Sequence, residues 1–231
     1  MHKDVHSLRY AVYCKEKGYL DPKNYPDGQE YDEYDDYATN FAAFSKTGDI
    51  IGTVRLVCPK QQQRFPYQDF CTPLPDVELP PIGKAAEISR LIISPGFREK
   101  SEVVEFGFSS LLSKLAGKSG AKQQKPEYTR VEPAVALSTS PRILLGLFRK
   151  MYRYSIENGI THWYASMERT LARMLARMHF SFNQISSQVD YYGPVSLYLV
   201  SIEDLERNLE AKNPALLAWF RKSKSDDPPL I

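Results

Sequence analysis

One segment in the first half of the chain, residues 84–94 (KAAEISRLIIS), places two charged residues inside an apolar, β-branched run. Such a run is typical of a buried strand, and the SPG sequence at 94–96 ends it. On a regular strand Glu87 and Arg90, three residues apart, point to opposite faces and cannot simply neutralise each other. A β-bulge would instead turn both onto one face. Because an unpaired buried charge is very costly, the fold must bring partners to both.

A helix and a β-hairpin are expected before this segment. Apolar residues recur at helical spacing over residues 4–18, where Gly18 ends the helix, and a polar loop rich in Pro, Asp and Tyr follows at 19–38. Residues 40–45 and 50–58 form the hairpin around a KTGD turn. The proline-rich residues 59–83 are expected to have little regular structure.

The second half of the chain alternates helices and strands. Ser140-Pro141 is typical of a helix start and Gly159 of a helix stop, which predicts a helix over 140–158. The other expected elements are a helix at 102–117, a mobile basic loop at 118–130, a strand at 161–167, a helix at 168–178, strands at 182–189 and 195–201, an amphipathic helical tail at 202–222 and a frayed end at 223–231.

This order predicts an α/β fold with a mixed sheet, antiparallel hairpins at its start and end, and a crossover helix in the middle. We expect one domain over residues 1–203, with the helical tail at 204–231 packing on it or extending from it. The order lacks the regular strand–helix alternation of a dinucleotide-binding fold, and no glycine-rich phosphate fingerprint is present.

Composition excludes several classes of protein. A chain of 231 residues with a net charge of +2 is an ordinary globular protein without the footprint of a nucleic-acid partner. No apolar run reaches the roughly 20 residues that cross a bilayer, and no leader opens the chain. Cys14, Cys58 and Cys71 have no metal-ligand spacing and indicate reduced thiols in a cytoplasmic protein. The four histidines suggest no metal site and no catalytic triad.

Five pieces of the chain, in order and at compatible spacing, resemble one family. They are LRYAVYCKEKGYL (8–20), EYDEYD (30–35), IIGTVRLV (50–57), EISRLIIS (87–94) and HWYASMERTLARMLARM (162–178). Together they resemble the GNAT-fold acyltransferases of the branch that contains acyl-homoserine-lactone synthases and long-chain N-acyl amino acid synthases. The chain is most similar to the acyltransferases associated with exosortase systems. The resemblance covers roughly residues 8–200, and implies a mostly antiparallel twisted sheet flanked by helices with an extra helix at the C-terminus.

The resemblance also implies functional residues and a reaction. The positions that match the family's acceptor pocket and its supporting ion pairs are Arg9, Tyr13, Tyr19, Asp32, Asp35, Arg55, Glu87 and Arg90, and Ser89 lies among them. The reaction so implied is amide formation between an acceptor amine and an acyl thioester.

The residues themselves allow two interpretations of Glu87. Amide formation needs a neutral amine and a group that removes its proton, and a carboxylate buried in an apolar strand has the raised pKa that suits a general base. The alternative is a structural acid that is satisfied by the backbone or by an arginine. We favour the base.

The arginines in apolar surroundings need acidic partners. Asp32 and Asp35 can supply them to Arg55 and Arg90, with Arg9 reaching in from the first helix; such a cluster could bind the carboxylate or amine of an acceptor. Taken alone, the acids of this loop would be only a solvated surface. Two roles are open for Tyr31, Tyr34 and Tyr37: they line an acceptor pocket, or they only pack against neighbouring residues of the protein.

The donor side departs from the usual GNAT pattern. The Q/R-x-x-G-x-G/A turn that holds the pyrophosphate of CoA is replaced by SPGFREKS at 94–101, which favours acyl carrier protein over acyl-CoA as donor. We place the phosphopantetheine near Ile92, Ser94 and Phe148, with its phosphate at the helix start formed by Ser140 and Arg142. The apolar Ile143, Leu144, Leu147, Phe148 and Met151 form core or an acyl tunnel.

Because carrier proteins are acidic, a basic surface is expected beside the donor site. Its principal residues are Arg98, Lys100, Lys150 and Arg153, with further basic residues at Lys114, Lys118, Lys122, Lys125, Arg142, Arg149 and in the stripe Arg169, Arg173 and Arg177. A solvated helix face is the alternative.

The sequence therefore predicts an enzyme without a permanently bound cofactor that transfers a medium or long acyl chain from acyl carrier protein to a small amine, an amino acid. No histidine neighbours a cysteine, so direct transfer is expected rather than an acyl-enzyme. Two alternatives stay open: a homoserine-lactone synthase that uses S-adenosylmethionine, and a non-catalytic module that binds acyl groups or acyl carriers.

Overall fold

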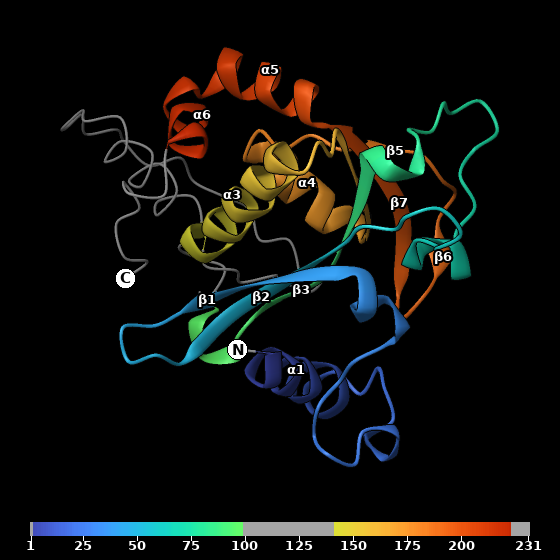
Figure 1. Ribbon diagram of the computed structural model, residues 1–231, viewed down its shortest axis with the longest axis vertical. Coiled ribbons are helices and arrows are strands. Elements are labelled where there is room, and N and C mark those ends of the chain that lie inside the picture. Colours follow the sequence, from blue (N-terminus) through green and yellow to red (C-terminus); the bar gives the residue numbers. More distant parts are fainter. Residues whose placement is uncertain (1, 99–140, 223–231) are drawn as a thin grey trace, which may run out of the picture.

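A computed structural model of the chain describes residues 2–98 and 141–222 (Figure 1). Seven strands form one sheet in the order β1-β2-β3-β4-β7-β5, with β6 on β7. The strands are β1 (Ala38–Phe44), β2 (Ile50–Val57), β3 (Ala85–Ile93), β4 (His162–Met167), β5 (Asn183–Gln184), β6 (Val189–Asp190) and β7 (Pro194–Ser201). The helices are α1 (His2–Tyr10), α3 (Pro141–Glu157), α4 (Arg169–Arg177), α5 (Ile202–Lys212) and α6 (Pro214–Arg221). The helix expected at 102–117, the loop at 118–130 and the end at 223–231 lie outside the described residues.

The strand directions confirm the predicted mixed sheet. β1, β2 and β3 are antiparallel neighbours, and so are β4 and β7, whereas β3 and β4 are parallel. Parallel neighbours need a connection that crosses over one face of the sheet, and α3 belongs to that connection. The sequence predicted its crossover helix at this point.

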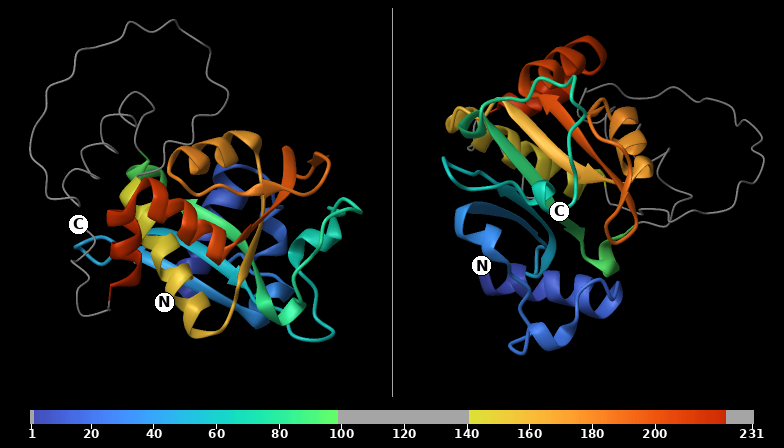
Figure 2. Two further views of the ribbon diagram at one scale, coloured as in Figure 1. Left: turned by 90° about the horizontal axis from the view of Figure 1, so that it is seen from above. Right: turned by 90° about the vertical axis from the view of Figure 1, so that its right-hand side faces the viewer.

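Two layers cover the sheet (Figure 2). The helices α3, α4, α5 and α6 lie on one face and share the main hydrophobic core with it, around buried residues such as Trp163 and Leu144. On the other face, Leu8 of α1 and Val12, in the helical turns that follow α1, pack against Ile92. The irregular segment after β2 forms a second small core there. Glu87 and the ion pairs described below lie on this second face.

Gly52 lets α3 approach the sheet closely. A Cβ at this position would lie 2.8 Å from the Ile143 Cγ2 and 3.1 Å from the carbonyl oxygen of Ile92. Real side chains do not tolerate such distances without a shift of the neighbours. The first turn of α3 is therefore held against the ends of β2 and β3 because this residue has no side chain.

Three expected elements differ in detail. The first helix is regular only through Tyr10 and continues as a π-helix over Ala11–Glu16, before Gly18 ends it at φ +63°. The strand expected at 182–189 is two short strands, because Ile185 and Ser186 between them pair with the segment around Pro73 as well as with β7. The tail is two helices rather than one, because Asn213 caps the second and Pro214 cannot continue the first.

The helical tail is part of the same core. Leu205 and Leu209 of α5 and Leu217 and Phe220 of α6 are buried in the main core cluster. Within residues 2–98 and 141–222, the structure contains no helix long and apolar enough to cross a membrane.

Candidate active site

The parallel strands β3 and β4 part half-way along their length. They are paired only through Ala85–Ile88 and His162–Ala165; the residues that follow pair with β2 and β7 alone. A cavity of about 420 Å³ opens at this point. Its walls include Glu87, the residues 88–93 of β3, the residues 165–168 at the end of β4, and side chains from α3, α4 and the first helix.

A β-bulge lies in β3 where the cavity begins. Gly52 and Thr53 of β2 pair with Ile93 and Ile92, but Arg55 pairs with Ser89. Two residues of β3, Arg90 and Leu91, therefore stand opposite the single Val54. Arg90 adopts φ +52°, a left-handed conformation that is uncommon for a residue with a side chain.

The bulge changes which side chains share a face. Ile88 and Ile93 are five residues apart, which would place them on opposite faces of a regular strand, yet both belong to the main core. Ser89 and Arg90 both contact the ion pairs on the α1 side. Glu87 and Arg90 consequently lie on one face. The expectation of opposite faces on a regular strand is wrong, and the β-bulge, which the sequence allowed as the alternative, is present.

Glu87 is a nearly isolated buried carboxyl group. It is 2% exposed, and its Oε2 accepts a hydrogen bond of 2.9 Å from the backbone N–H of Tyr67. Burial raises its pKa to about 8, against the lowering effect of that hydrogen bond and of the charges of Arg55 and Arg90. A carboxyl group of this kind can exchange a proton near neutral pH, and it lines the cavity.

A network of ion pairs lies next to Glu87 and includes the three arginines that the sequence singled out. Arg9, which is fully buried, forms a two-pronged pair with Asp35 at 2.7 and 2.9 Å and a further pair with Glu30. Arg55 binds Asp35 at 3.0 Å, pairs with Asp32, and donates to the Ser89 hydroxyl at 3.0 Å. These contacts join the first helix, the acidic loop and strands β2 and β3.

Arg90 completes the network. Its Nη2 lies 2.9 Å from Glu30 Oε1 and 2.9 Å from Asp32 Oδ2. Its guanidinium carbon lies 5.2 Å from the centre of the Tyr13 ring, a cation–π contact. Burial is the largest single influence on the pKa of Arg90 and lowers it, but the charges of Glu30, Tyr13 and Asp32 and the hydrogen bond to Glu30 together raise it above its ordinary value.

The network contains three carboxylates for three guanidinium groups. Burial alone would raise the pKa of Glu30 and of Asp35, but the hydrogen bonds and charges of the arginines hold both below their ordinary values. Glu30 was not singled out by sequence, although it stands in the EYDEYD motif and is fully buried. A count of charges would have found it, since Asp32 and Asp35 cannot alone balance three arginines.

Aromatic side chains form the mouth of the cavity. Tyr13 stacks near Tyr19, which stacks on Tyr192 with ring centres 5.3 Å apart, and Tyr191 stacks on Phe70 with centres 3.7 Å apart. All five line the cavity. Tyr13 and Tyr19 were expected from sequence. The other three were not: Phe70 comes from the segment after β2, and Tyr191 and Tyr192 come from the turn between β6 and β7.

The opposite end of the cavity is apolar. It is lined by Leu144 and Phe148 of α3 together with Leu171, Met174 and Leu175 of α4 and by Phe182. The sequence predicted five apolar residues of α3 as either core or acyl tunnel. Leu144 and Phe148 line the cavity, whereas Ile143, Leu147 and Met151 lie in the core and do not line the cavity.

Some expected site residues lie elsewhere. Tyr34 is buried away from the cavity, where its hydroxyl contacts Asp69 and its backbone N–H donates to Asp32 at 3.0 Å. Ile92 lines the cavity, whereas Ser94 and the exposed Arg142 do not. Ser140 and Lys100 lie outside the described residues, as do Lys114, Lys118, Lys122 and Lys125.

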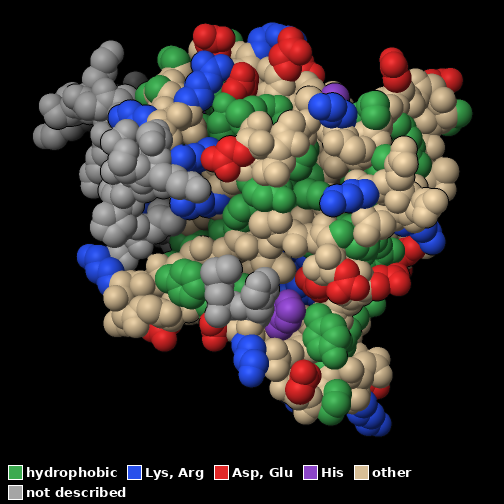
Figure 3. Space-filling view, viewed as in Figure 1, with side chains coloured by type: hydrophobic (Ala, Val, Ile, Leu, Met, Phe, Trp, Pro, Cys, Tyr) green, Lys and Arg blue, Asp and Glu red, His purple; other side chains and the backbone are tan. Residues whose placement is uncertain are grey.

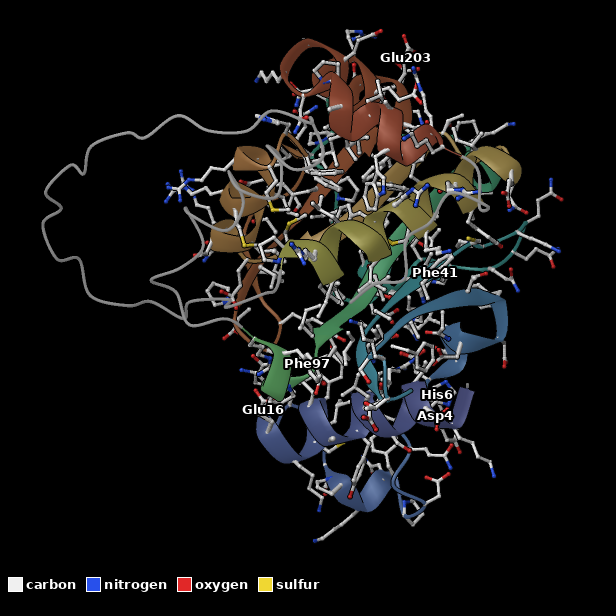
Figure 4. The ribbon with its side chains drawn as sticks, turned by 90° about the vertical axis from the view of Figure 1, so that its left-hand side faces the viewer. Asp4, His6, Glu16, Phe41, Phe97 and Glu203 are labelled. Atoms are coloured by element: carbon white, nitrogen blue, oxygen red, sulfur yellow. The ribbon has the colours of Figure 1, made fainter. Side chains whose placement is uncertain are left out.

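The basic residues that the structure describes on the expected carrier surface lie in different surroundings. Arg98 lines the cavity but pairs with Glu16 and donates to the Ile93 carbonyl at 2.8 Å; Figure 4 shows Glu16 beside Phe97 at this corner. Lys150 is exposed and Arg153 half-buried, while Arg149 packs on Trp219. On the face shown in Figure 3, basic side chains are interspersed with acidic and apolar ones. Along α4, the side chains of Arg169, Arg173 and Arg177 are all exposed.

Comparison with known proteins gives the fold its name. The acetyltransferase (GNAT) domain family matches residues 8–106. The structure superposes on TofI, crystallised with an inhibitor and MTA, at TM-score 0.57 and 16% identity over 93% of this chain and 91% of that one. The chain has the GNAT fold.

Two further solved structures share this GNAT fold. The CoA-dependent acyl-homoserine lactone synthase BjaI, with SAM and isopentyl-CoA, gives a TM-score of 0.57 at 14% identity over 94% of this chain and 90% of that one. FeeM, an N-acyl amino acid synthase from uncultured soil microbes, gives a TM-score of 0.55 at 14% identity over 90% of this chain and 89% of that one. No curated protein matches the sequence. The domain match supports an acyltransferase enzyme.

Proposed function

We propose that this protein is an N-acyltransferase that moves a medium or long fatty acyl chain from a thioester to the amine of a small acceptor, an amino acid. One observation carries the proposal: Glu87, a buried carboxyl group with a pKa of about 8, lines a cavity where two parallel strands part. One end of that cavity is apolar and the other aromatic and charged, which suits an acyl chain at one end and a polar acceptor at the other.

Glu87 acts as the general base. The nitrogen of the neutral amine attacks the thioester carbonyl carbon, its proton passes to the Glu87 carboxylate directly or through a water molecule, and the carbon–sulfur bond breaks. The departing thiolate takes a proton, which balances the step and returns Glu87 to its carboxylate form. A base whose pKa lies near the working pH is effective in such a transfer.

The acceptor lies on the α1 side of the gap, between the aromatic mouth and Arg90. The ion-pair network holds this wall rigid, because each of its three arginines bridges two carboxylates from the acidic loop. Since the charges within the network already balance, its main contribution is to position Glu87, Ser89 and Arg90 rather than to offer a free charge.

The acyl donor is a carrier protein. The segment after β3, SPGFREKS, lacks the glycine turn that holds the CoA pyrophosphate in GNAT proteins, which favours a donor bound mainly through its phosphopantetheine and acyl chain. BjaI, whose name describes it as CoA-dependent, makes acyl-CoA the alternative donor. The exposed arginines of α3 and α4 can attract an acidic carrier protein to the cavity. The reaction takes place in the cytoplasm. The acyltransferase unit extends over residues 1–203, with 204–231 as its tail.

The test is reconstitution with purified protein. An amino-acid mixture and fatty acyl carrier protein are incubated with the enzyme, and parallel reactions add S-adenosylmethionine or replace the carrier protein with acyl-CoA. The products are identified by mass spectrometry. N-acyl amino acids that disappear with Glu87→Gln in a folded protein support the proposal. A homoserine-lactone product that requires S-adenosylmethionine would overturn it, and so would tight binding of acyl carrier protein without any turnover. Equal use of free acyl-CoA would contradict the choice of donor alone.

A further inference from the structure

Ser166 is a half-buried residue whose hydroxyl group has no role in the mechanism proposed above. Its hydroxyl oxygen is shielded from solvent and has no hydrogen-bond partner within the described part of the chain. Buried hydroxyl groups are normally bonded, and one that is left alone makes the folded state less stable. An orphan of this kind in the wall of a cavity indicates a hydrogen bond that a ligand completes.

Ser166 stands where β3 and β4 separate. The last paired residues are Ile88 and Ala165, so Ser166 is the first residue of β4 without a partner on β3. Its backbone pairs with Leu197 of β7 on the other side. The strand is therefore fixed by one neighbour while its opposite edge faces the gap.

The side chain of Ser166 points to the face on which Glu87 lies. Trp163, Ala165 and Met167 belong to the main core, so the alternate residues Tyr164 and Ser166 face the other way. Tyr164 is the parallel partner of Glu87. Ser166 thus lies one step further along the same face, on the far side of the gap from Ser89, whose hydroxyl already accepts a hydrogen bond from Arg55.

We propose that the Ser166 hydroxyl is a catalytic group that donates a hydrogen bond to the thioester carbonyl oxygen in the gap between β3 and β4. The inference rests on the proposed acyl transfer. When the amine attacks, the carbon–nitrogen bond forms, the carbonyl electron pair moves onto oxygen, and Ser166 stabilises the oxyanion. The pair then returns as the carbon–sulfur bond breaks and thiolate leaves. Ser166 gives up no proton in either step.

Kinetics with Ser166→Ala are the first test. Loss of one oxyanion donor lowers kcat by about 10²–10³, and we expect such a fall with little change in the KM of either substrate. The melting temperature of the unliganded variant should equal or exceed that of the wild type, because an unsatisfied group has been removed. Ser166→Thr, which keeps a hydroxyl, should retain most of the activity. Unchanged kcat in Ser166→Ala would overturn the proposal.

Infrared spectroscopy separates this role from a structural one. The probe is a ketone analogue of the acyl-phosphopantetheine donor, in which a methylene group replaces the sulfur, with a ¹³C label in the carbonyl. The hydrogen bond should lower the carbonyl stretching frequency in the wild-type complex, and Ser166→Ala should reverse that shift. An identical frequency in both complexes would overturn the assignment, even if the variant were slow.

Two controls make the outcome specific. Thr161, the residue directly before β4, is exposed and donates its hydroxyl to the Lys84 carbonyl at 3.0 Å; Thr161→Ala should leave kcat and the infrared shift unchanged. If wild-type protein forms no N-acyl product, the proposed function fails. If it forms the product and Ser166→Ala does so equally fast, only the role of Ser166 fails.

Discussion

Glu87 and Arg90 occupy one face of the sheet although three residues separate them on a single strand. The bulge opposite Val54 causes this, and it leaves Ser89 and Arg90, which are adjacent in sequence, on the same side. The proposed general base and Arg90, the member of the ion-pair network that lines the cavity, are thereby brought to one wall. Arg90 holds an uncommon left-handed backbone conformation at this point, the kind of local strain that is found at functional sites.

The first prediction concerns the buried ion pairs. Arg9→Ala removes the partner of Glu30 and Asp35 in a site with almost no solvent, so the free energy of unfolding should fall by about 3–5 kcal/mol. Denaturant unfolding measures it. The control is Arg207→Ala, whose pairs with Glu203 and Asp204 are exposed and should contribute less than about 1 kcal/mol. Equal losses in both variants would show that the network is not a structural anchor.

The second prediction is a dependence of stability on pH that comes from Glu87. Its pKa is about 8 in the folded protein, against an ordinary value of 4.5 that applies to the unfolded chain, so the folded state holds a proton that the unfolded state releases. The stability that this proton contributes is complete below about pH 4.5 and is lost as the pH rises towards 8, by up to about 1.4 kcal/mol per pH unit.

Glu87→Gln removes this dependence and isolates it. The stability of the variant relative to wild type should increase between about pH 5 and pH 8, as measured by denaturant unfolding at each pH. Glu30 and Asp35 act in the opposite direction, because their pKa values are lowered; their contribution disappears on acidification in both proteins and cancels in the comparison. A constant difference between the two proteins would contradict a raised pKa at Glu87.

The third prediction tests the contact between α3 and the sheet. Gly52→Ala introduces a methyl group 2.8 Å from the Ile143 Cγ2, and overpacking of this kind should destabilise the protein by about 1–3 kcal/mol. Gly83 is the matched control, since a Cβ there meets nothing within 4 Å and the backbone conformation suits any residue. Thermal unfolding of both variants measures the difference. If Gly52→Ala were as stable as Gly83→Ala, α3 would lie further from the strands than the structure places it.

The fourth prediction concerns the acyl chain. Met174 lines the apolar end of the cavity and packs at the edge of the main core, so Met174→Trp should fill space in the cavity. We expect kcat/KM to fall at least about tenfold for the longest acyl donors, the effect of losing about 1.4 kcal/mol of binding energy, and to change little for short ones. A chain-length series of acyl carrier proteins measures this. A uniform loss for every length would contradict an acyl chain in this part of the cavity.

Much of the fold follows from local patterns in the sequence. The hairpin of β1 and β2, the strand β3 and the helices α3 and α4 were predicted because each combines a clear periodicity with a turn, cap or stop signal of its own. The mixed topology followed from their order. The split tail could also have been predicted, since Asn213-Pro214 is a local signal for a new helix start.

The cavity is different, because it depends on contacts between distant segments. Nothing in KAAEISRLIIS alone fixes a bulge, which requires the register of β3 against β2. Tyr191 and Tyr192 reach the cavity only after a hairpin forms in a distant part of the chain. Ser166 has no sequence signal at all: an orphaned hydroxyl is recognisable only when every neighbour is in place.

The pH dependence of turnover tests the central claim, that Glu87 removes the proton from the acceptor amine. With wild-type protein, kcat/KM should rise with pH and level off above an apparent pKa near 8, which is the value that burial gives the carboxyl group of the unliganded enzyme. Glu87→Gln, folded as judged by circular dichroism, should lose about 10²–10⁴ in kcat together with that titration. The same pH profile and a near-normal kcat in Glu87→Gln would contradict the account.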